Sequence, residues 1–309
     1  MENYRHSAKS FREELKAKGV FYTAPEMAEY MKKLLPDDVQ EIYDPTCGNG
    51  GLLSAFSDDV QKYGQDIDGE QVRIAEERLQ NFHGVTGDTL AAPAFLDRKF
   101  QYIIANPPFS VKWNPVEDER FSDAPVLPPP GKADYAFLLH ILYLLAENGK
   151  AVVMNFPGIL YRGQREGKIR QWLCEQNYIE KVIAIPGKKF EDTKIATCIL
   201  ILNRSKQTTD IIFRDEENQI EKTVSLEEVK AQDFNLSVSS YLHIETEKEE
   251  IDINTLNSDI ENSTLAHLRA TLDMMLMLNH TIGDKRNFAG FLTEILNIVH
   301  ETTDKLKVS

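Results

Sequence analysis

Short apolar runs alternate with amphipathic segments from about residue 40 to residue 203. This alternation is typical of a parallel sheet whose strands are joined by crossover helices. The apolar runs predict strands over residues 41–44, 62–66, 83–88, 101–106, 150–155, 179–185 and 196–203. Helical patterns lie between them, over residues 69–80, 134–146 and 164–176. The pattern therefore predicts an α/β fold built on a parallel sheet.

The pattern changes near residue 244. A short strand is expected over 211–214 and a helix over 225–231, and the acidic run 245–250 then marks a domain boundary. Apolar residues recur at helical spacing on both sides of Gly283, which predicts a two-helix hairpin over 252–307. These positions are Leu265, Leu268, Leu272, Met275 and Leu276, then Phe288, Phe291, Leu292, Ile295, Leu296 and Val299. We expect the hairpin to pack either back onto the main domain, 21–244, or against the helices of a partner. A short helical segment, 1–20, precedes the main domain.

Composition narrows the choice of partners and compartment. The 309 residues, 42% of them hydrophobic, suffice for one large domain with an appendage and need no disulfides. The three cysteines have no metal-ligand spacing, so no metal site is predicted. The widely spaced cysteines suggest no disulfide framework, which favours the reducing cytoplasm. The start of the chain has no apolar signal segment, and no run approaches the roughly 20 apolar residues of a membrane span. A net charge of -14 argues against strong unaided binding to nucleic acid, but allows binding through a partner.

The segment Asn106-Pro107-Pro108-Phe109 follows a predicted strand and is the most informative stretch of the chain. Open α/β sheets place their ligand chemistry at such strand ends. The Asn106 side-chain oxygen and the Pro107 carbonyl can accept hydrogen bonds from both N–H groups of a planar exocyclic amine, which frees its lone pair for methylation. Pro107 and Pro108 fix φ and hold that carbonyl in place, and Phe109 offers a face on which a base can stack. The alternative is a simple strand-end turn.

A glycine-rich turn, 43–51, follows the first predicted strand and suits a nucleoside cofactor. Asp44 would repel a pyrophosphate but attract the ammonium or sulfonium of S-adenosylmethionine. Asp66 ends the next strand, where an acid accepts both ribose hydroxyls; its alternative role is a helix N-cap. The cofactor-binding residues expected with them are Thr46, Gly48, Gly50, Ile67 beside the adenine ring, Asp88 as acceptor for its amine, and Thr89. The alternative for Asp88 is a plain turn residue.

With these motifs, the chain resembles the N6-adenine DNA methyltransferases, specifically the modification (M) subunit of type I restriction–modification systems. The likeness covers about residues 20–243. It includes Phe21-Tyr22-Thr23, the turn 43–51, the strand end 63–66, 87–89, Asn106-Pro107-Pro108-Phe109 and the stretches 132–137, 160–163, 166–170, 189–193, 195–200 and 234–241. The resemblance implies a Rossmann-like S-adenosylmethionine-dependent methyltransferase sheet with a C-terminal α-helical appendage.

The resemblance also implies roles for individual residues. Phe21, Tyr22 and Thr23 would line the methionine end of S-adenosyl-L-methionine, with Asp44 and Gly48 at its amino acid part. Asp66 would hold the ribose and Asp88 the adenine, while Asn106, Pro107 and Phe109 would hold a flipped target adenine. The implied partners are DNA, a specificity (S) subunit bound through the C-terminal helices, and a restriction subunit. Two features depart from the family: only about 20 residues precede Phe21, and Asp66 stands where Glu is common.

Two further features bear on access to DNA. The proline-rich loop 114–132 is a candidate lid over the base pocket. The best basic clusters are candidate phosphate contacts, with a solvated helix face as the alternative; they comprise Arg162, Arg165, Lys168, Arg170, Lys188 and Lys189.

Two other functions fit parts of the pattern. Methyltransferases of protein glutamine or of RNA bases use similar Asn-Pro-Pro-aromatic turns, although these usually end in Tyr. A scaffold or antirestriction homologue that binds the cofactor or a specificity subunit without methylating is the other alternative.

Overall fold

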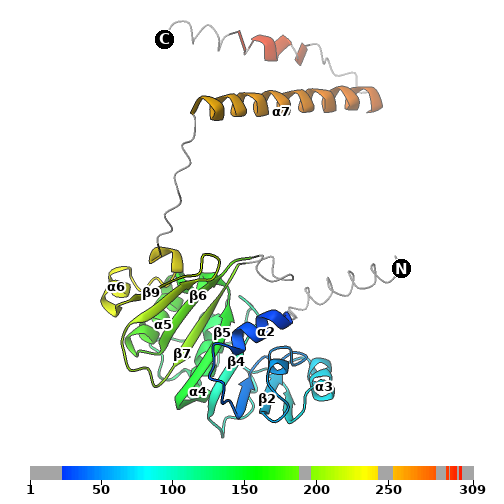
Figure 1. Cartoon of the computed structure of the whole chain (residues 1–309). Coiled ribbons are helices and arrows are strands. Elements are labelled where there is room, and N and C mark those ends of the chain that lie inside the picture. Colours follow the sequence, from blue (N-terminus) through cyan, green and yellow to red (C-terminus); the bar gives the residue numbers. More distant parts are fainter. Residues whose placement is uncertain are drawn as a thin grey trace. The chain divides into compact units, whose positions relative to one another are not determined.

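The computed structural model describes residues 23–187, 196–242, 253–282, 290–291, 293–297 and 299–300. The chain divides into two units, Met1–His243 and Ile244–Ser309. The first unit is an α/β domain, and the described part of the second is helical (Figure 1). Phe21, Tyr22, Lys188, Lys189 and Gly283 lie outside the described residues.

The first unit is built on one mixed sheet with the strand order β3-β2-β1-β4-β5-β7-β6-β8-β9 (Figure 1). The strands are β1 (Glu41–Asp44), β2 (Gln61–Asp66), β3 (Phe82–Thr86), β4 (Phe100–Ala105), β5 (Leu145–Asn155), β6 (Ile179–Ile185), β7 (Thr197–Asn203), β8 (Ile211–Asp215) and β9 (Ile220–Val224). Strands β1 to β5 pair in parallel, as the sequence pattern predicts.

The sheet departs from the predicted parallel pattern at β7, which runs antiparallel to both β5 and β6. A parallel crossover needs about a dozen residues or more, usually including a helix. The connection between Ile185 and Thr197 is shorter than that, so β7 reverses direction. Strand β9 was not predicted because four of its five residues are exposed, and an edge strand of this kind has no apolar run.

The helices of the first unit cover both faces of the sheet. They are α2 (Pro25–Lys32), α3 (Gly69–Arg78), α4 (Asp134–Leu144), α5 (Gln164–Glu175) and α6 (Leu226–Ala231), with short 3-10 turns at Leu53–Ala55, Glu119–Phe121, Pro157–Leu160 and Val238–Ser240. Alternate residues of β5 enter two different core clusters, with Val153 on the face covered by α4 and α5 and Val152 on the face covered by α2. This alternation follows from the two-residue period of a strand.

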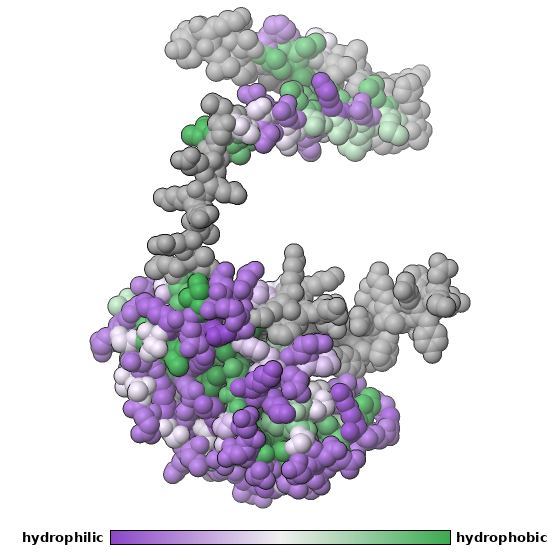
Figure 2. All heavy atoms as spheres, in the orientation of Figure 1, coloured by the Kyte–Doolittle hydropathy of each residue, from purple (hydrophilic) through white to green (hydrophobic). Residues whose placement is uncertain are grey.

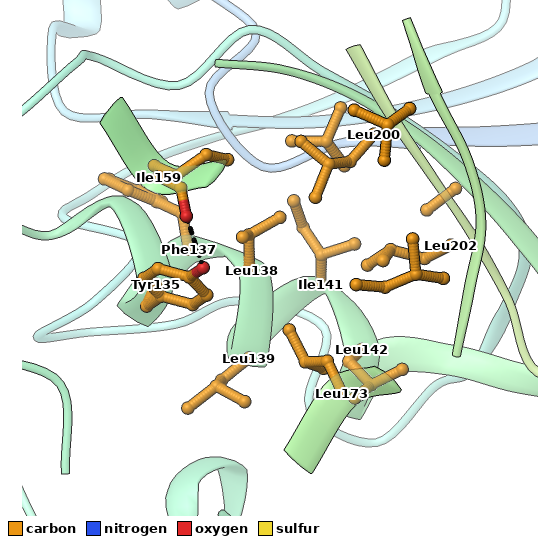
Figure 3. Packing of buried hydrophobic residues seen from close by; sticks show 14 of the residues in the cluster. Tyr135, Phe137, Leu138, Leu139, Ile141, Leu142, Ile159, Leu173, Leu200 and Leu202 are labelled. Carbon is orange, nitrogen blue, oxygen red and sulfur yellow. Dashed lines mark hydrogen bonds between the residues drawn. The ribbon is translucent and has the colours of Figure 1, made fainter. Parts of the chain in front are cut away.

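Helix α4 is buried almost along its whole length, which fixes the position of its first turn. Leu138 and Ile141 of α4 pack with Leu200 and Leu202 of β7 (Figure 3). The Tyr135 hydroxyl donates a hydrogen bond to the Ile159 carbonyl at 2.7 Å, so the polar end of this buried ring has a partner.

The second unit contains the long helix α7 (Ile253–Ile282). Several apolar side chains lie exposed along it, among them Leu265, Leu268 and Leu276. Figure 2 shows apolar as well as polar side chains at the surface of this unit. Across the part of the chain that the structure describes, no helix combines the length and apolar character that a membrane span requires.

Candidate functional site

The carboxyl ends of β1, β2 and β4 bring the predicted site residues together. Strand β1 lies between β2 and β4, so Asp44, Asp66 and Asn106 meet at one edge of the sheet. A cavity of about 740 Å³ opens there, lined by Pro45, Thr46, Gly48, Asp66, Ile67, Asp68, Gly69, Gln71, Asp88, Thr89, Leu90, Asn106, Pro108, Val111, Lys112, Trp113, Asn114 and Phe137.

A second, smaller cavity of about 30 Å³ adjoins it. Its lining residues are Thr23, Asp44, Thr46, Cys47, Gly48, Asn49, Gly51, Leu52, Gln71 and Asn106. Thr46, Gly48, Gln71 and Asn106 line both cavities. The two cavities therefore meet at these shared residues.

Asp66 shapes the glycine-rich turn as well as lining the larger cavity. Its Oδ2 accepts a hydrogen bond from the Gly48 N–H at 2.8 Å, and its Oδ1 accepts one from the Asp68 N–H at 3.0 Å. The N-cap of α3 is Asp68, whose Oδ1 accepts from the Glu70 N–H, so the N-cap alternative for Asp66 is wrong. Burial raises the pKa of Asp66 despite these bonds.

Gly50 is required by the turn itself. Its φ is +78°, and an added Cβ would lie 2.6 Å from Leu79 Cδ1.

We expect Gly50→Ala to lower the free energy of unfolding by about 1–3 kcal/mol, because the left-handed backbone and the packed Leu79 both oppose a side chain. Urea unfolding measures this loss. Gly131→Ala is the matched control, because nothing lies within 4 Å of a Cβ there and its φ is not in the left-handed region. Equal stability of the two variants would show that the Gly50 turn is not constrained.

Asp44 is buried beside the smaller cavity. Its Oδ1 accepts hydrogen bonds from the Thr46 N–H at 2.9 Å and from the Thr46 hydroxyl at 3.4 Å. Burial raises the pKa of Asp44 to about 8, and the nearby Asp66 carboxylate adds to this rise. A cationic ligand in the cavity would reverse the shift, because a positive charge stabilises the carboxylate. Asp44 therefore fits an ammonium group.

The segment after β3 forms another wall of the larger cavity. Asp88 Oδ1 accepts from the Leu90 N–H at 2.9 Å and from the Ala91 N–H at 3.3 Å, so Asp88 is also a turn residue. The Thr89 hydroxyl donates to the Pro45 carbonyl, which ties this wall to the glycine-rich turn. Ile67 lines the same cavity and is 71% exposed, so its side chain is accessible to a ligand there.

Arg120 anchors the backbone of this wall, a role that was not predicted from the sequence. Its guanidinium donates to the Thr89 carbonyl at 2.8 Å and to the Leu90 carbonyl at 2.6 Å, and it pairs with Asp118. Burial and the Arg120 charge lower the pKa of His140, which contacts the same guanidinium, to about 3. Of the loop 114–132, Asn114 lines the cavity, while Arg120 and Phe121 are buried. The lid role of this loop stays a prediction.

Among the described residues, one polar atom of the Asn106 side chain has a hydrogen-bond partner and the other has none. Its Nδ2 donates to the Thr23 hydroxyl oxygen at 3.1 Å. Its Oδ1 is buried and has no hydrogen-bond partner within the described part of the protein, as is also true there of Asn155 Nδ2, Asn177 Oδ1 and Thr197 Oγ1. Of these four residues, Asn106 is the one that lines the two cavities. A buried acceptor left without a partner costs free energy, so it is expected where a ligand supplies the missing donor.

The rest of the tetrapeptide after β4 is divided between the cavity and the core. Pro107 is buried and Pro108 lines the larger cavity. Phe109 is partly buried against the α2-side core cluster and is not among the residues that line the two cavities.

Two residues of the predicted basic cluster point inward. Arg170 is buried and donates to the Phe234 and Arg162 carbonyls, both at 2.7 Å. Arg162 lies 3.2 Å from the Glu166 carboxylate and 3.4 Å from that of Asp134. The interpretation of Arg162 and Arg170 as phosphate contacts is therefore wrong, because their guanidinium groups already bind carbonyl and carboxylate oxygens within the domain. Arg165 and Lys168 are exposed.

Gln71, Trp113 and Phe137 were also missed as cavity residues. Gln71 lies on a helix, where nothing in the local pattern distinguishes it from a solvated polar residue. Trp113 follows the Asn-Pro-Pro-Phe segment closely, and that proximity is the one signal that could have identified it. Within the described ranges, no group of three or more His, Cys, Asp or Glu side chains is placed to hold a metal ion.

The family model described as N-6 DNA Methylase matches residues 3–223. The type I restriction enzyme MpnII methylase subunit of Mycoplasma pneumoniae is 31% identical, over 80% of this chain and 57% of that protein. The HindI methylase subunit of Haemophilus influenzae is 29% identical, over 65% of this chain and 50% of that protein. The chain thus spans about half the length of these curated relatives.

A solved structure has the same fold. The type I restriction-modification methyltransferase subunit from Streptococcus thermophilus superposes with a TM-score of 0.67 at 28% identity, covering 72% of this chain and 59% of that one. A putative class I S-adenosylmethionine-dependent methyltransferase from Listeria monocytogenes, 16% identical with a TM-score of 0.50, shares the fold.

Proposed function

Because the chain belongs to the N-6 DNA methylase family, we propose that it transfers a methyl group from S-adenosyl-L-methionine to the N6 atom of adenine in DNA, as the modification subunit of a type I restriction–modification system. The observation that carries the proposal is the vacant, buried Oδ1 of Asn106 at the junction of the two cavities. An exocyclic amine offers the N–H donor that this atom lacks.

The residues around the two cavities fit S-adenosylmethionine. The buried Asp44 carboxylate is suited to the ammonium of the methionine part, and Thr23 lines the same smaller cavity. Phe21 and Tyr22 precede Thr23 in the sequence, and their proposed role at the methionine end rests on the family resemblance alone. Each Asp66 oxygen accepts one backbone N–H and retains lone pairs for a ribose hydroxyl. Ile67 and Asp88 line the larger cavity, where they can flank and hydrogen-bond the adenine ring. When bound, the cofactor supplies an electrophilic methyl group on a sulfonium.

The chain's own contribution to methyl transfer is to hold and polarise the amine. Asn106 Oδ1 and the Pro107 carbonyl accept its two N–H groups, which draws the nitrogen toward tetrahedral geometry and exposes its lone pair. Both acceptors are fixed before the reaction, so they stabilise the positive charge that develops on nitrogen without reorganising. No residue needs to act as a general base, because the product ammonium is acidic enough to release its proton to water.

The target adenine must leave the duplex to reach these acceptors, which costs a few kcal/mol. We propose that Phe109 stacks on the extruded base. Phe109→Ala should then weaken DNA-dependent methylation by about 1–3 kcal/mol, the usual value of one base–aromatic stack. Phe109→Tyr should retain most activity, whereas Phe109→Leu keeps an apolar side chain without a flat face and should resemble Ala. If Leu is as active as Phe, this residue serves core packing.

The sequence specificity and DNA affinity are proposed to come from a specificity subunit. The net charge of -14 is unfavourable for unaided DNA binding, and the exposed apolar residues of α7 offer a surface for a partner's helices. A restriction subunit would complete the system.

The test is transfer of a labelled methyl group to DNA, with and without a candidate specificity subunit. We expect N6-methyldeoxyadenosine to form when both proteins are present. Cofactor binding without transfer under either condition would favour a non-methylating scaffold, and label on protein or RNA would favour the other methyltransferase classes.

A further inference from the structure

Ser110 follows directly after the Asn-Pro-Pro-Phe segment and has a φ of +54°. A residue with a side chain seldom adopts this left-handed conformation unless its surroundings impose it. The Ser110 N–H donates to Asp134 Oδ1 at 3.0 Å, and Arg162 Nη2 donates to Ser110 Oγ at 3.0 Å. The unfavourable bend is therefore held from two sides.

The two residues that hold Ser110 are themselves fixed. The Asp134 side chain is fully buried at the start of α4, the helix that lies in the core. Arg162 pairs with Asp134 and with Glu166, whose side chain is 8% exposed. Removing one member of a buried ion pair strongly destabilises the folded protein, because the remaining charge is left buried without a partner. We call Ser110, Asp134 and Arg162 the Ser110 clamp.

The clamp lies between two functional segments. Before it are Asn106 and Pro107, the proposed acceptors for the amine. After it come Val111 and Trp113, which line the larger cavity. The Val111 carbonyl accepts from the Ala133 N–H at 2.8 Å, so the exit from the bend is anchored next to Asp134. The direction of the chain at Ser110 therefore sets both the acceptors and the cavity wall.

We propose that Asp134 and Arg162 are positioning residues for methyl transfer: by holding Ser110 in its left-handed conformation, they fix the Pro107 carbonyl relative to Asn106 Oδ1. The inference rests on the proposed function. Neither Asp134 nor Arg162 is among the residues lining the two cavities, so both act through Ser110. A displacement of about 1 Å at a reacting centre can lower a rate about 10²-fold.

Two variants of the full chain disturb the clamp by different routes. Arg162→Gln removes the positive charge and the N–H donors of the guanidinium group. Gly158→Ala changes none of the three clamp residues, but its Cβ would lie 2.5 Å from Arg162 Nη2 and would displace the guanidinium. Lys230→Gln removes one exposed positive charge in α6 and is the matched control.

We expect both clamp variants to lower the single-turnover methyl-transfer rate by about 10- to 100-fold. The dissociation constant for S-adenosylmethionine should change much less, by no more than a few fold, because its proposed polar ligands Asp44, Asp66 and Asp88 belong to the segments after β1, β2 and β3 and not to the segment that the clamp holds. Lys230→Gln should match the unmodified protein. This separation of rate from cofactor binding distinguishes positioning from general destabilisation. Unchanged transfer rates in both clamp variants would overturn the inference.

Hydrogen exchange followed by mass spectrometry tests the clamp without relying on activity. The variants should increase exchange in peptides covering 107–114 and leave those covering 41–66 unchanged. Unchanged exchange at 107–114, or an equal increase throughout the domain, would overturn the clamp. If the unmodified protein transfers no methyl group with any partner, the proposed function fails, and the exchange pattern still decides whether the clamp holds this segment.

Discussion

Asn106→Ala should lower the rate of methyl transfer by about 10²-fold or more while leaving the dissociation constant for S-adenosylmethionine within a few fold. The magnitude is that of removing one preorganised group that stabilises developing charge. The variant loses the vacant Oδ1, the atom assigned to the amine, whereas Asp44 and Asp66 remain. Single-turnover transfer to DNA and a cofactor titration on the same preparation measure the two quantities.

The stability of the same variant provides a control. In the folded protein Asn106 makes one hydrogen bond, from Nδ2 to the Thr23 hydroxyl oxygen, while its Oδ1 has no described partner. Removing the side chain should therefore cost only about 0.5–1.5 kcal/mol of unfolding free energy. Asn106→Asp keeps an acceptor at this position and should retain more activity than Asn106→Ala. An equal collapse of cofactor affinity and transfer rate would mean that Asn106 is structural.

Cofactor affinity should rise with pH between about 6 and 8, by up to about tenfold per pH unit. In the free protein, burial raises the pKa of Asp44 to about 8, so the carboxyl holds a proton below that pH. An ammonium ligand requires the carboxylate, and binding must therefore release this proton at any pH below 8. Above pH 8 no proton is released, and the contribution of Asp44 to the pH dependence ends. Calorimetry in buffers of different ionisation enthalpy measures the proton count directly.

Asp44→Asn separates this effect from other titrating groups. Asparagine has nearly the shape of the neutral acid but cannot ionise, so the variant should bind the cofactor more weakly near pH 8 and lose the Asp44 pH dependence. The free protein should respond in the opposite sense: the folded state holds a proton that the unfolded chain releases, so stability declines as the pH rises from about 4 to 8. Proton release that persists in Asp44→Asn would assign it to another group.

The parts of the site that could be predicted are those set by local sequence. Asp44, Asp66 and Asn106 each stand at or just after the end of an apolar run, and in parallel strands such ends share one edge of the sheet. Strands β1, β2 and β4 are parallel in the structure, so these three residues meet as expected. The cofactor roles of Thr46, Gly48, Gly50, Ile67, Asp88 and Thr89 remain proposals that the cavity lining supports in every case but Gly50.

The parts that could not be predicted depend on contacts between distant segments. Arg162 and Arg170 look like surface cations in the sequence, yet each is held by acceptors from other segments of the fold. Arg120 lies in a proline-rich loop, and nothing local shows that it supports the carbonyls of Thr89 and Leu90. The reversal of β7 has a different origin. Strand direction follows from the length of the connection and not from the apolar run itself, and the short connection between the predicted strands 179–185 and 196–203 is visible in the sequence.

The most direct test of the central claim is an experimental structure of the full chain with a specificity subunit, a non-reactive S-adenosylmethionine analogue and DNA containing the target adenine. The account predicts that N6 of an extruded adenine lies within about 3.2 Å of both Asn106 Oδ1 and the Pro107 carbonyl oxygen, a normal hydrogen-bond distance. The amino acid part of the analogue should contact Asp44. An adenine bound elsewhere, or an Asn106 Oδ1 that still has no partner in the complex, would contradict it.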